Sequence, residues 1–196
     1  MGSAIHDLLY YRPLFSGRRA GHWLAARRHT GEAGMNLLTG GYWIGVPDGD
    51  PRVVDIYERH YSGVKSKATR QARLRAGISG VGESMVLLTS DNKALWVWRH
   101  NTIARDDGQV GVECSVFRNE GLVLSSLLII EAVDLAWQRW QGQRLFTYVW
   151  DSKVRSVNPG YCYKQAGWKV CGRNKDGRLT ILELLPLEQP AQERLE

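Results

Sequence analysis

Residues 112–119 read VECSVFRN, residues 127–140 read LLIIEAVDLAWQRW, and residues 144–151 read RLFTYVWD. The first and third segments are rich in β-branched and aromatic residues, which predicts strands. In the second segment apolar residues recur at three- and four-residue spacing, which predicts an amphipathic helix with Ser125 and Ser126 as its N-cap. Together the segments predict a βαβ unit, which commonly holds a small-molecule group where its strands separate.

The same signals extend outward from this unit. Asp50-Pro51 and Ser66 are typical helix starts, and Gly63 and Gly77 are typical ends. The pattern therefore predicts strands at 41–47, 84–91, 93–100, 111–119, 145–150, 168–174 and 178–186, and helices at 51–62, 66–76, 127–140 and 158–167. Three consecutive strands in the middle of this order predict an α+β fold with a mixed sheet of about seven strands and about four helices, not a doubly wound one.

The 196 residues suffice for one full domain, which we expect at 41–187. Residues 1–40 are Gly-rich and basic; they form either a poorly ordered arm or one that touches nucleic-acid backbone. We expect a frayed polar tail at 188–196. With 43% hydrophobic and 23% charged residues, no apolar run long enough to span a bilayer, and three cysteines, the chain is expected to be a cytoplasmic protein of a reduced compartment.

The net charge of +6 is concentrated in one region. No acidic residue occurs from Arg59 to Gly82. Several cations on one helix side can neutralise phosphates and release counterions, so this run is either a solvated face or a DNA contact. The candidate DNA-binding residues are Lys65, Lys67, Arg70, Arg73 and Arg75.

The order of elements, with YKQAGW at 163–168, resembles the GNAT-type N-acyltransferase superfamily over residues 41–186. The resemblance implies that two central strands diverge to leave a cleft, and that amides at the following helix bind an acyl-CoA pyrophosphate. It puts Tyr163 at the position of the general acid, with Tyr161 as the alternative. Alternatively, each tyrosine is a core aromatic residue whose hydroxyl is hydrogen-bonded within the protein.

The donor loop departs from the family pattern. Arg118 and Gly121 keep an Arg-x-x-Gly spacing around Asn119, but leucines follow where small residues are usual. A helix N-terminus at Ser125 and Ser126 can still bind phosphate through backbone amides, and Ser125 is also included among the catalytic candidates. The donor could be acetyl-CoA or a glycyl-tRNA, which would supply an adduct's nitrogen directly.

Three segments, ERHYSG at 58–63, FRNEG at 117–121 and WDSKVRSVNPGYCYKQAGW at 150–168, resemble the phage Mom family. Mom proteins hypermodify the N6 amine of adenine to a carbamoylmethyl-type adduct and so protect phage DNA from restriction in the bacterial host. The resemblance implies a double-stranded DNA substrate. Other possibilities are an acetyltransferase for a protein or small-molecule amine, and a non-catalytic DNA-binding module.

Asp151 follows an apolar strand and is expected in the cleft, as a base or else as a turn cap, and His60 is the alternative base. His60 and Tyr61 should close the first helix, and His100 is a competing histidine. By the Mom resemblance His60, Tyr61 and Asp151 could bind Fe²⁺, although their spacing is no motif. Base flipping commonly relies on aromatic stacking, for which Tyr42, Trp43 and Trp98 are candidates.

Overall fold

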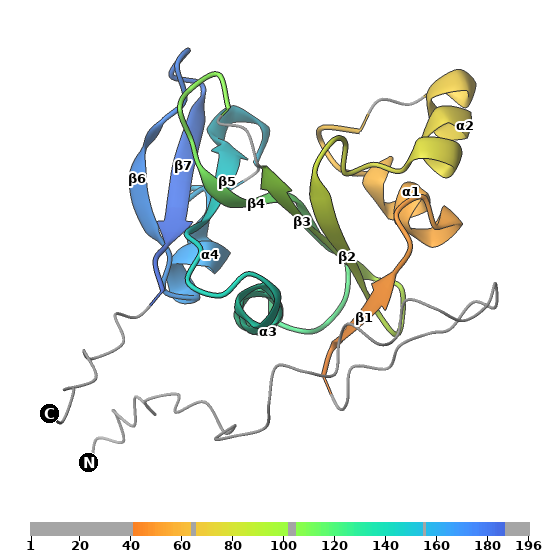
Figure 1. Cartoon of the computed structure of the whole chain (residues 1–196), viewed down its shortest axis with the longest axis horizontal. Helices are drawn as coiled ribbons and strands as arrows, with labels where there is room; N and C mark the ends of the chain where they lie inside the picture. Colours follow the sequence, from red (N-terminus) through yellow and green to blue (C-terminus); the bar gives the residue numbers. More distant parts are fainter. Residues whose placement is uncertain (1–40, 64–65, 102–104, 155, 187–196) are drawn as a thin grey trace, which may run out of the picture. The chain divides into compact units, whose positions relative to one another are not determined.

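The computed structural model describes residues 41–63, 66–101, 105–154 and 156–186. Within them one sheet has the strand order β1-β2-β3-β4-β5-β7-β6 (Figure 1). Its strands are β1 (Trp43–Val46), β2 (Glu83–Thr89), β3 (Ala94–Asn101), β4 (Gly111–Asn119), β5 (Leu145–Trp150), β6 (Lys169–Arg173) and β7 (Leu179–Leu184). β4 and β5 pair in parallel, and the other neighbours are antiparallel. The α+β class with a mixed sheet is therefore confirmed.

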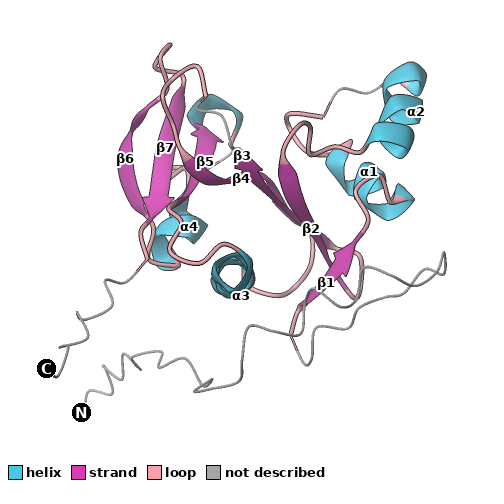
Figure 2. Cartoon of the chain, in the orientation of Figure 1, coloured by secondary structure: helices cyan, strands magenta, loops and turns pink. Residues whose placement is uncertain are grey.

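The helices lie on the two faces of the sheet (Figure 2). The helices are α1 (Pro51–Tyr57), α2 (Lys67–Ala76), α3 (Ser125–Arg139) and α4 (Tyr161–Gln165), with a 3₁₀ turn, η2 (Asp151–Lys153), directly after β5. One apolar cluster joins α3 and α4 to the sheet, and the other joins α1 to the opposite face. We call these the α3 face and the α1 face.

Tryptophan side chains fasten α3 to the sheet. Trp43, Trp96 and Trp98 are fully buried. The indole N–H of Trp43 donates to the Leu128 carbonyl at 2.8 Å, and that of Trp98 donates to the Ala132 carbonyl at 2.9 Å. Buried indoles usually find such a partner, and one turn of α3 separates the two acceptors. The helix is therefore held in a fixed register against β1 and β3.

A β-bulge in β4 has a direct effect on the neighbouring strand. Val97 of β3 pairs with Val116, but Trp98 pairs with Cys114, so Ser115 is an extra residue. A bulge bends its strand and increases the local twist. The β4–β5 pairing ends at Cys114 and Thr147, although β4 continues to Asn119 and β5 to Trp150. The bulge thus accounts for the separation of the strands, and we call the opening the seam.

Helix boundaries account for most differences from the sequence-based expectations. The first helix ends at Tyr57, not Ser62, because His60 and Gly63 take part in tight turns: the His60 amide donates to the Tyr57 carbonyl, and the Gly63 amide to the His60 carbonyl. The helix α4 begins at Tyr161, after Gly160 in a left-handed conformation, and not at Asn158.

The start of α3 was also predicted wrongly. Ser125 and Ser126 belong to the helix, and its N-cap residue is Leu124, without a side-chain cap. The N-cap prediction at Ser66 is confirmed, since the Thr69 amide donates to Ser66 Oγ at 3.1 Å.

Some expectations concern residues outside the described ranges. The predicted arm at 1–40, the tail at 188–196 and Lys65 all lie there. None of the described helices has the length and apolarity needed to cross a membrane.

Candidate functional site

The seam brings together side chains from four distant segments. Cys114 of β4 is buried where the strands part, and the Tyr163 hydroxyl lies 3.4 Å from its Sγ. Tyr61 joins this group from the turns after α1, since its ring contacts that of Trp150 at the end of β5, with centroids 6.5 Å apart. Cys114 lies near enough to contribute to the raised pKa of its phenol. Two of the catalytic candidates, Tyr61 and Tyr163, therefore lie near the end of β5 and near Cys114, and their catalytic roles stay predictions.

Tyr61 and His60 lie in the turns after α1, and their rings are 4.0 Å apart between centroids. The Tyr61 ring is 43% exposed. Its hydroxyl end is buried, and this burial, followed by the nearby Cys114, raises the pKa of the phenol. The phenol is therefore protonated near neutral pH and can donate a hydrogen bond into the seam.

His60 is buried and neutral. Burial, followed by the positive charge of Arg118, lowers the pKa of His60 to about 4. The ring Nδ1 lies 2.7 Å from Ser62 Oγ, and the Ser62 backbone amide donates to it at 3.3 Å. Since an amide can only donate, Nδ1 accepts, and the neutral ring carries its proton on Nε2. This tautomer makes His60 a support for Tyr61 and a donor, not the base.

The two tyrosines of α4 point in different directions. Tyr161 is 53% exposed, whereas Tyr163 is buried among the rings of Trp96, Phe117 and Trp168, with centroids 5.2–6.0 Å away. Burial raises the pKa of Tyr163 well above its usual value. Its role as a general acid stays a prediction, because a leaving group would have to enter the seam to reach the enclosed hydroxyl.

Asp151 lies where β5 ends, as the sequence predicted. Its Oδ2 accepts hydrogen bonds from Arg173 Nη2 at 3.0 Å and from Thr180 Oγ1 at 2.8 Å. Its Oδ1 is buried and has no hydrogen-bond partner among the described residues. An orphaned buried carboxylate oxygen is costly and needs an explanation. A role in which Oδ1 meets a substrate N–H provides one.

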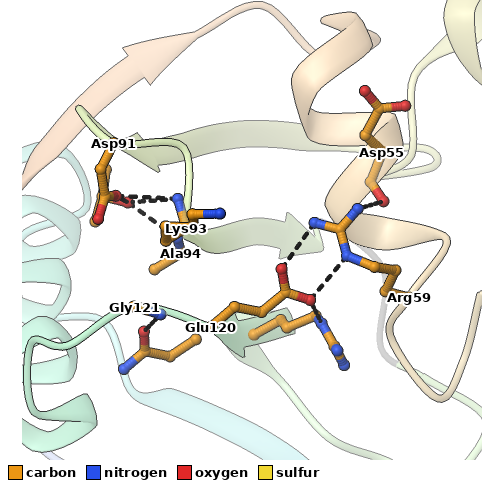
Figure 3. Close-up of polar contacts among 10 residues, drawn as sticks. Asp55, Arg59, Asp91, Lys93, Ala94, Glu120 and Gly121 are labelled. Atoms are coloured by element: carbon orange, nitrogen blue, oxygen red, sulfur yellow. Dashed lines mark hydrogen bonds and ion pairs between the residues drawn. The ribbon is translucent and has the colours of Figure 1, made fainter.

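The predicted donor loop is organised around Glu120 (Figure 3). Arg59, just after α1, forms two hydrogen bonds of 2.8 Å with its carboxylate, and Arg118 donates to it at 2.6 Å. These bonds, led by those from Arg59, lower the pKa of Glu120 to about 2. Arg118 is thus engaged within the protein, and the loop is tied to the segment that carries His60 and Tyr61.

Asn119, Gly121 and Ser125 do lie together, but they bond one another. Asn119 Nδ2 donates to Ser125 Oγ at 3.1 Å, and Asn119 Oδ1 accepts from the Gly121 amide at 2.9 Å. The Glu120 amide donates to the Lys93 carbonyl at 2.8 Å, next to the turn where Asp91 caps Lys93 (Figure 3). Two loop amides are therefore already used, and the residues fit the usual grip on an acyl-CoA pyrophosphate poorly. Ser126 is half-buried in the first turn of α3.

The suggested Fe²⁺ ligands do not form a coordinating set. No group of three His, Cys, Asp or Glu side chains converges in the described part of the chain. His60 and Tyr61 are adjacent, but His60 Nδ1 faces Ser62, and the Asp151 carboxylate faces Arg173 and Thr180. A phenol with a raised pKa is a weak ligand. These three residues therefore do not fit a metal site.

Of the candidate DNA-binding residues on α2, two contact the protein itself and two are exposed. Arg70 pairs with Asp55 at 2.7 Å and Glu58 at 2.9 Å, and the Arg73 guanidinium lies 4.6 Å from the Tyr57 ring centroid. These two arginines attach α2 to α1, beside a surface depression of about 450 Å³. Lys67 and Arg75 are exposed and remain candidates for a phosphate contact.

The structure changes the interpretation of Trp43, Trp98 and His100. Trp43 and Trp98 are core residues and so cannot stack on a base, which corrects that expectation. His100, on β3, lies near Glu83 and Trp140, away from the seam residues described above. The sequence analysis missed Cys114, Glu120, Arg173 and Thr180, since pairing across distant segments leaves no local signal.

No known family model matches the chain. No curated protein matches it either. The resemblance to the acyltransferase superfamily and to the Mom family thus rests on the segments quoted from the sequence.

Proposed function

We propose that this protein is a DNA-modifying transferase that adds a carbamoylmethyl-type group to the N6 amine of adenine, in the manner of the Mom family. In phage or mobile-element DNA such a group would block restriction enzymes. The observation that carries the proposal is the position of Tyr163 beside Cys114 at the seam, with Tyr61 packed on Trp150 at the end of β5 and Asp151 directly after that strand.

Asp151 is the proposed base. The exocyclic amine of adenine is a poor nucleophile because its lone pair is delocalised into the ring, so it must lose a proton as it attacks. The unpartnered Oδ1 of Asp151 suits that proton, while Arg173 and Thr180 orient the carboxylate through Oδ2. Tyr163 is the proposed acid toward the leaving group. The neutral His60 ring supports Tyr61 at the seam.

The donor loop bears on the choice of donor. Attack of N6 on the ester carbonyl of a glycyl-tRNA forms an amide bond, breaks the ester bond and returns the proton to the tRNA hydroxyl. The immediate product is the N6-glycyl isomer of the carbamoylmethyl adduct, with the same elemental composition. To reach the carbamoylmethyl form, N6 must move from the carbonyl carbon to the methylene carbon while the glycyl nitrogen moves to the carbonyl carbon. Acetyl-CoA alone would not supply the nitrogen. Because the Glu120 and Gly121 amides are already bonded, we favour glycyl-tRNA over acetyl-CoA.

The experiment is nucleoside mass spectrometry of DNA from bacteria that express the full chain, with fragmentation to separate the isomers. We expect a modified deoxyadenosine in the parent and a loss of about 10²- to 10⁴-fold in Asp151→Asn, the usual effect of removing a general base. Asp176→Asn, which changes an exposed carboxylate in the β6–β7 turn, is the matched control.

Each outcome of this experiment has a clear meaning. Unmodified adenine in well-expressed parent protein argues against the proposal. If acetylated proteins or small amines accumulate instead, the seam serves an ordinary amine acetyltransferase. If DNA binding persists while every transfer assay is negative, the protein is a binding module, because fold alone does not determine function.

A further inference from the structure

A corner made by two aromatic rings lies on the surface beside Asp151. Tyr61 and Trp150 contact each other edge to face, with centroids 6.5 Å apart and an interplanar angle of 90°. Tyr61 is 43% exposed and Trp150 is partly exposed. Tyr61 packs against His60, and Asp151 follows Trp150 in the chain. Two perpendicular rings offer a flat third ring one face to stack on and one edge to rest against.

The corner is rigid on the Tyr61 side. The His60 ring packs against the Tyr61 ring, with centroids 4.0 Å apart. The segment that carries both residues is tied to the donor loop by the two hydrogen bonds between Arg59 and Glu120. A side chain held in this way loses little entropy when a ligand binds against it.

The open face of Trp150 is covered only loosely. The exposed Lys153 places its Nζ 5.4 Å from the indole centroid. The contact of an exposed cation with a ring is weaker than the stacking of a nucleobase on it. An entering base would therefore displace Lys153, whose ammonium could then pair with a neighbouring phosphate.

We propose that Trp150 and Tyr61 form the receptor for an adenine flipped out of duplex DNA, with the base stacked on the Trp150 ring. This inference rests on the proposed function, and it replaces Trp43 and Trp98 as the stacking residues. Asp151, the residue proposed to deprotonate the amine, directly follows Trp150 in the chain, and its carboxylate is held by Arg173 and Thr180. Enzymes that modify a base must take it out of the helix, and an aromatic platform offsets part of that cost.

The test compares two duplexes that differ at one position: an adenine opposite an abasic site, and the same adenine paired with thymine. Flipping an unpaired base costs less, so a receptor for flipped bases prefers the first duplex. By fluorescence anisotropy at constant salt we expect the parent to bind it roughly tenfold more tightly. In Trp150→Ala this preference should fall to about onefold, while binding to the fully paired duplex changes little.

Two further variants keep the test decisive. Trp150→Phe keeps an aromatic face, so it should retain part of the preference even if Trp150→Ala proves unstable. Tyr42, the third stacking candidate from the sequence, is 44% exposed next to β1, at the other edge of the sheet. Tyr42→Ala therefore tests the competing position, and it should leave the preference unchanged if Trp150 is the platform. A preference that survives in Trp150→Ala, or that the parent lacks, would overturn the inference.

The outcome also separates this inference from the proposed function. Modified adenine in the parent, with a duplex preference that does not depend on Trp150, would leave the function standing and remove the receptor. A preference that depends on Trp150, without any adduct, would leave the receptor standing and remove the chemistry. The same measurement can be made with an RNA hairpin loop. If Trp150 contributes as much to the affinity for this loop as to the affinity for the duplex with the unpaired adenine, the corner receives tRNA instead. This outcome also contradicts the inference.

Discussion

His60 shows how a single buried ring couples the site to the stability of the fold. It is 7% exposed, its Nδ1 is occupied by Ser62, and the Arg118 charge lies nearby. All three features favour the neutral ring. A histidine that stays neutral in the folded protein but takes up a proton in the unfolded chain makes folding depend on pH.

We therefore predict a loss of stability in mild acid. In the unfolded chain the histidine titrates near 6.5, whereas the pKa of His60 in the folded protein is about 4. The unfolded state binds more protons between these values, so the free energy of unfolding should fall by up to about 3 kcal/mol as the pH drops through this window.

Urea unfolding at about pH 7 and about pH 5 measures this effect. His60→Asn should remove most of the difference between the two conditions, whereas the same change at His100, half-buried on β3, should not. The carboxylates with lowered pKa values, such as Glu120, titrate below this window and do not obscure it. An unchanged pH dependence in His60→Asn would count against a buried neutral ring.

At the scale of elements, α2 differs from the other helices in how it is attached. None of its residues is buried. It is held to α1 by the ion pairs of Arg70 and by the contact between Arg73 and Tyr57, whereas α3 is held by a core of apolar side chains and two indole hydrogen bonds. Exposed ion pairs contribute little and are screened by salt.

We predict that α2 opens more readily than α3. In hydrogen–deuterium exchange the amides of residues 67–76 should exchange faster than those of residues 128–139, because local stability follows buried contacts. Arg70→Ala should accelerate exchange in α2 by roughly two- to fivefold, with α3 unchanged. Arg75→Ala, an exposed residue of the same helix, is the matched control. Equal protection of α2 and α3 would contradict this picture.

The strands and the helices differ in how well the sequence predicts them. The predicted strand bounds agree closely with those of the structure. Alternating apolar runs that are bounded by turn residues are typical of strands and fit few other structures. The helix ends did not: Ser125 and Ser126 look like caps, but Asn119 engages Ser125 from the preceding strand. The turns after Tyr57 depend on a contact between His60 and Ser62 that a helical period cannot reveal.

At the scale of the whole molecule, the exposed cations of α2 and the residues proposed to be catalytic belong to different elements. Lys67 and Arg75 lie exposed on α2, and the seam lies between two strands of the sheet. The sequence predicted that Asp151 and Tyr163 lie near the divergence of those strands, but it could not predict the orientation of their side chains. Arg173 and Thr180 come from the last hairpin and had no signature, since an ion pair between distant segments depends on the completed sheet.

We predict that binding to duplex DNA weakens steeply with salt, as expected when lysines and arginines displace counterions. Reversing two charges in Lys67→Glu/Arg75→Glu should reduce affinity at about 0.1 M salt by at least roughly tenfold and flatten the salt dependence. Lys169→Glu/Arg178→Glu, on the β6–β7 hairpin, changes the net charge equally and should have the smaller effect. Equal losses would indicate a general effect of net charge and no contact through α2.

The bulge at Ser115 has a consequence for how this site could arise or disappear. The seam opens because β4 contains one residue more than its partner strand can pair with. Deleting one codon would restore regular pairing and allow β4 to stay beside β5, closing the opening without changing any side chain around it. Access to the site therefore depends on the number of residues in β4, and a substitution at Ser115 would leave that number unchanged.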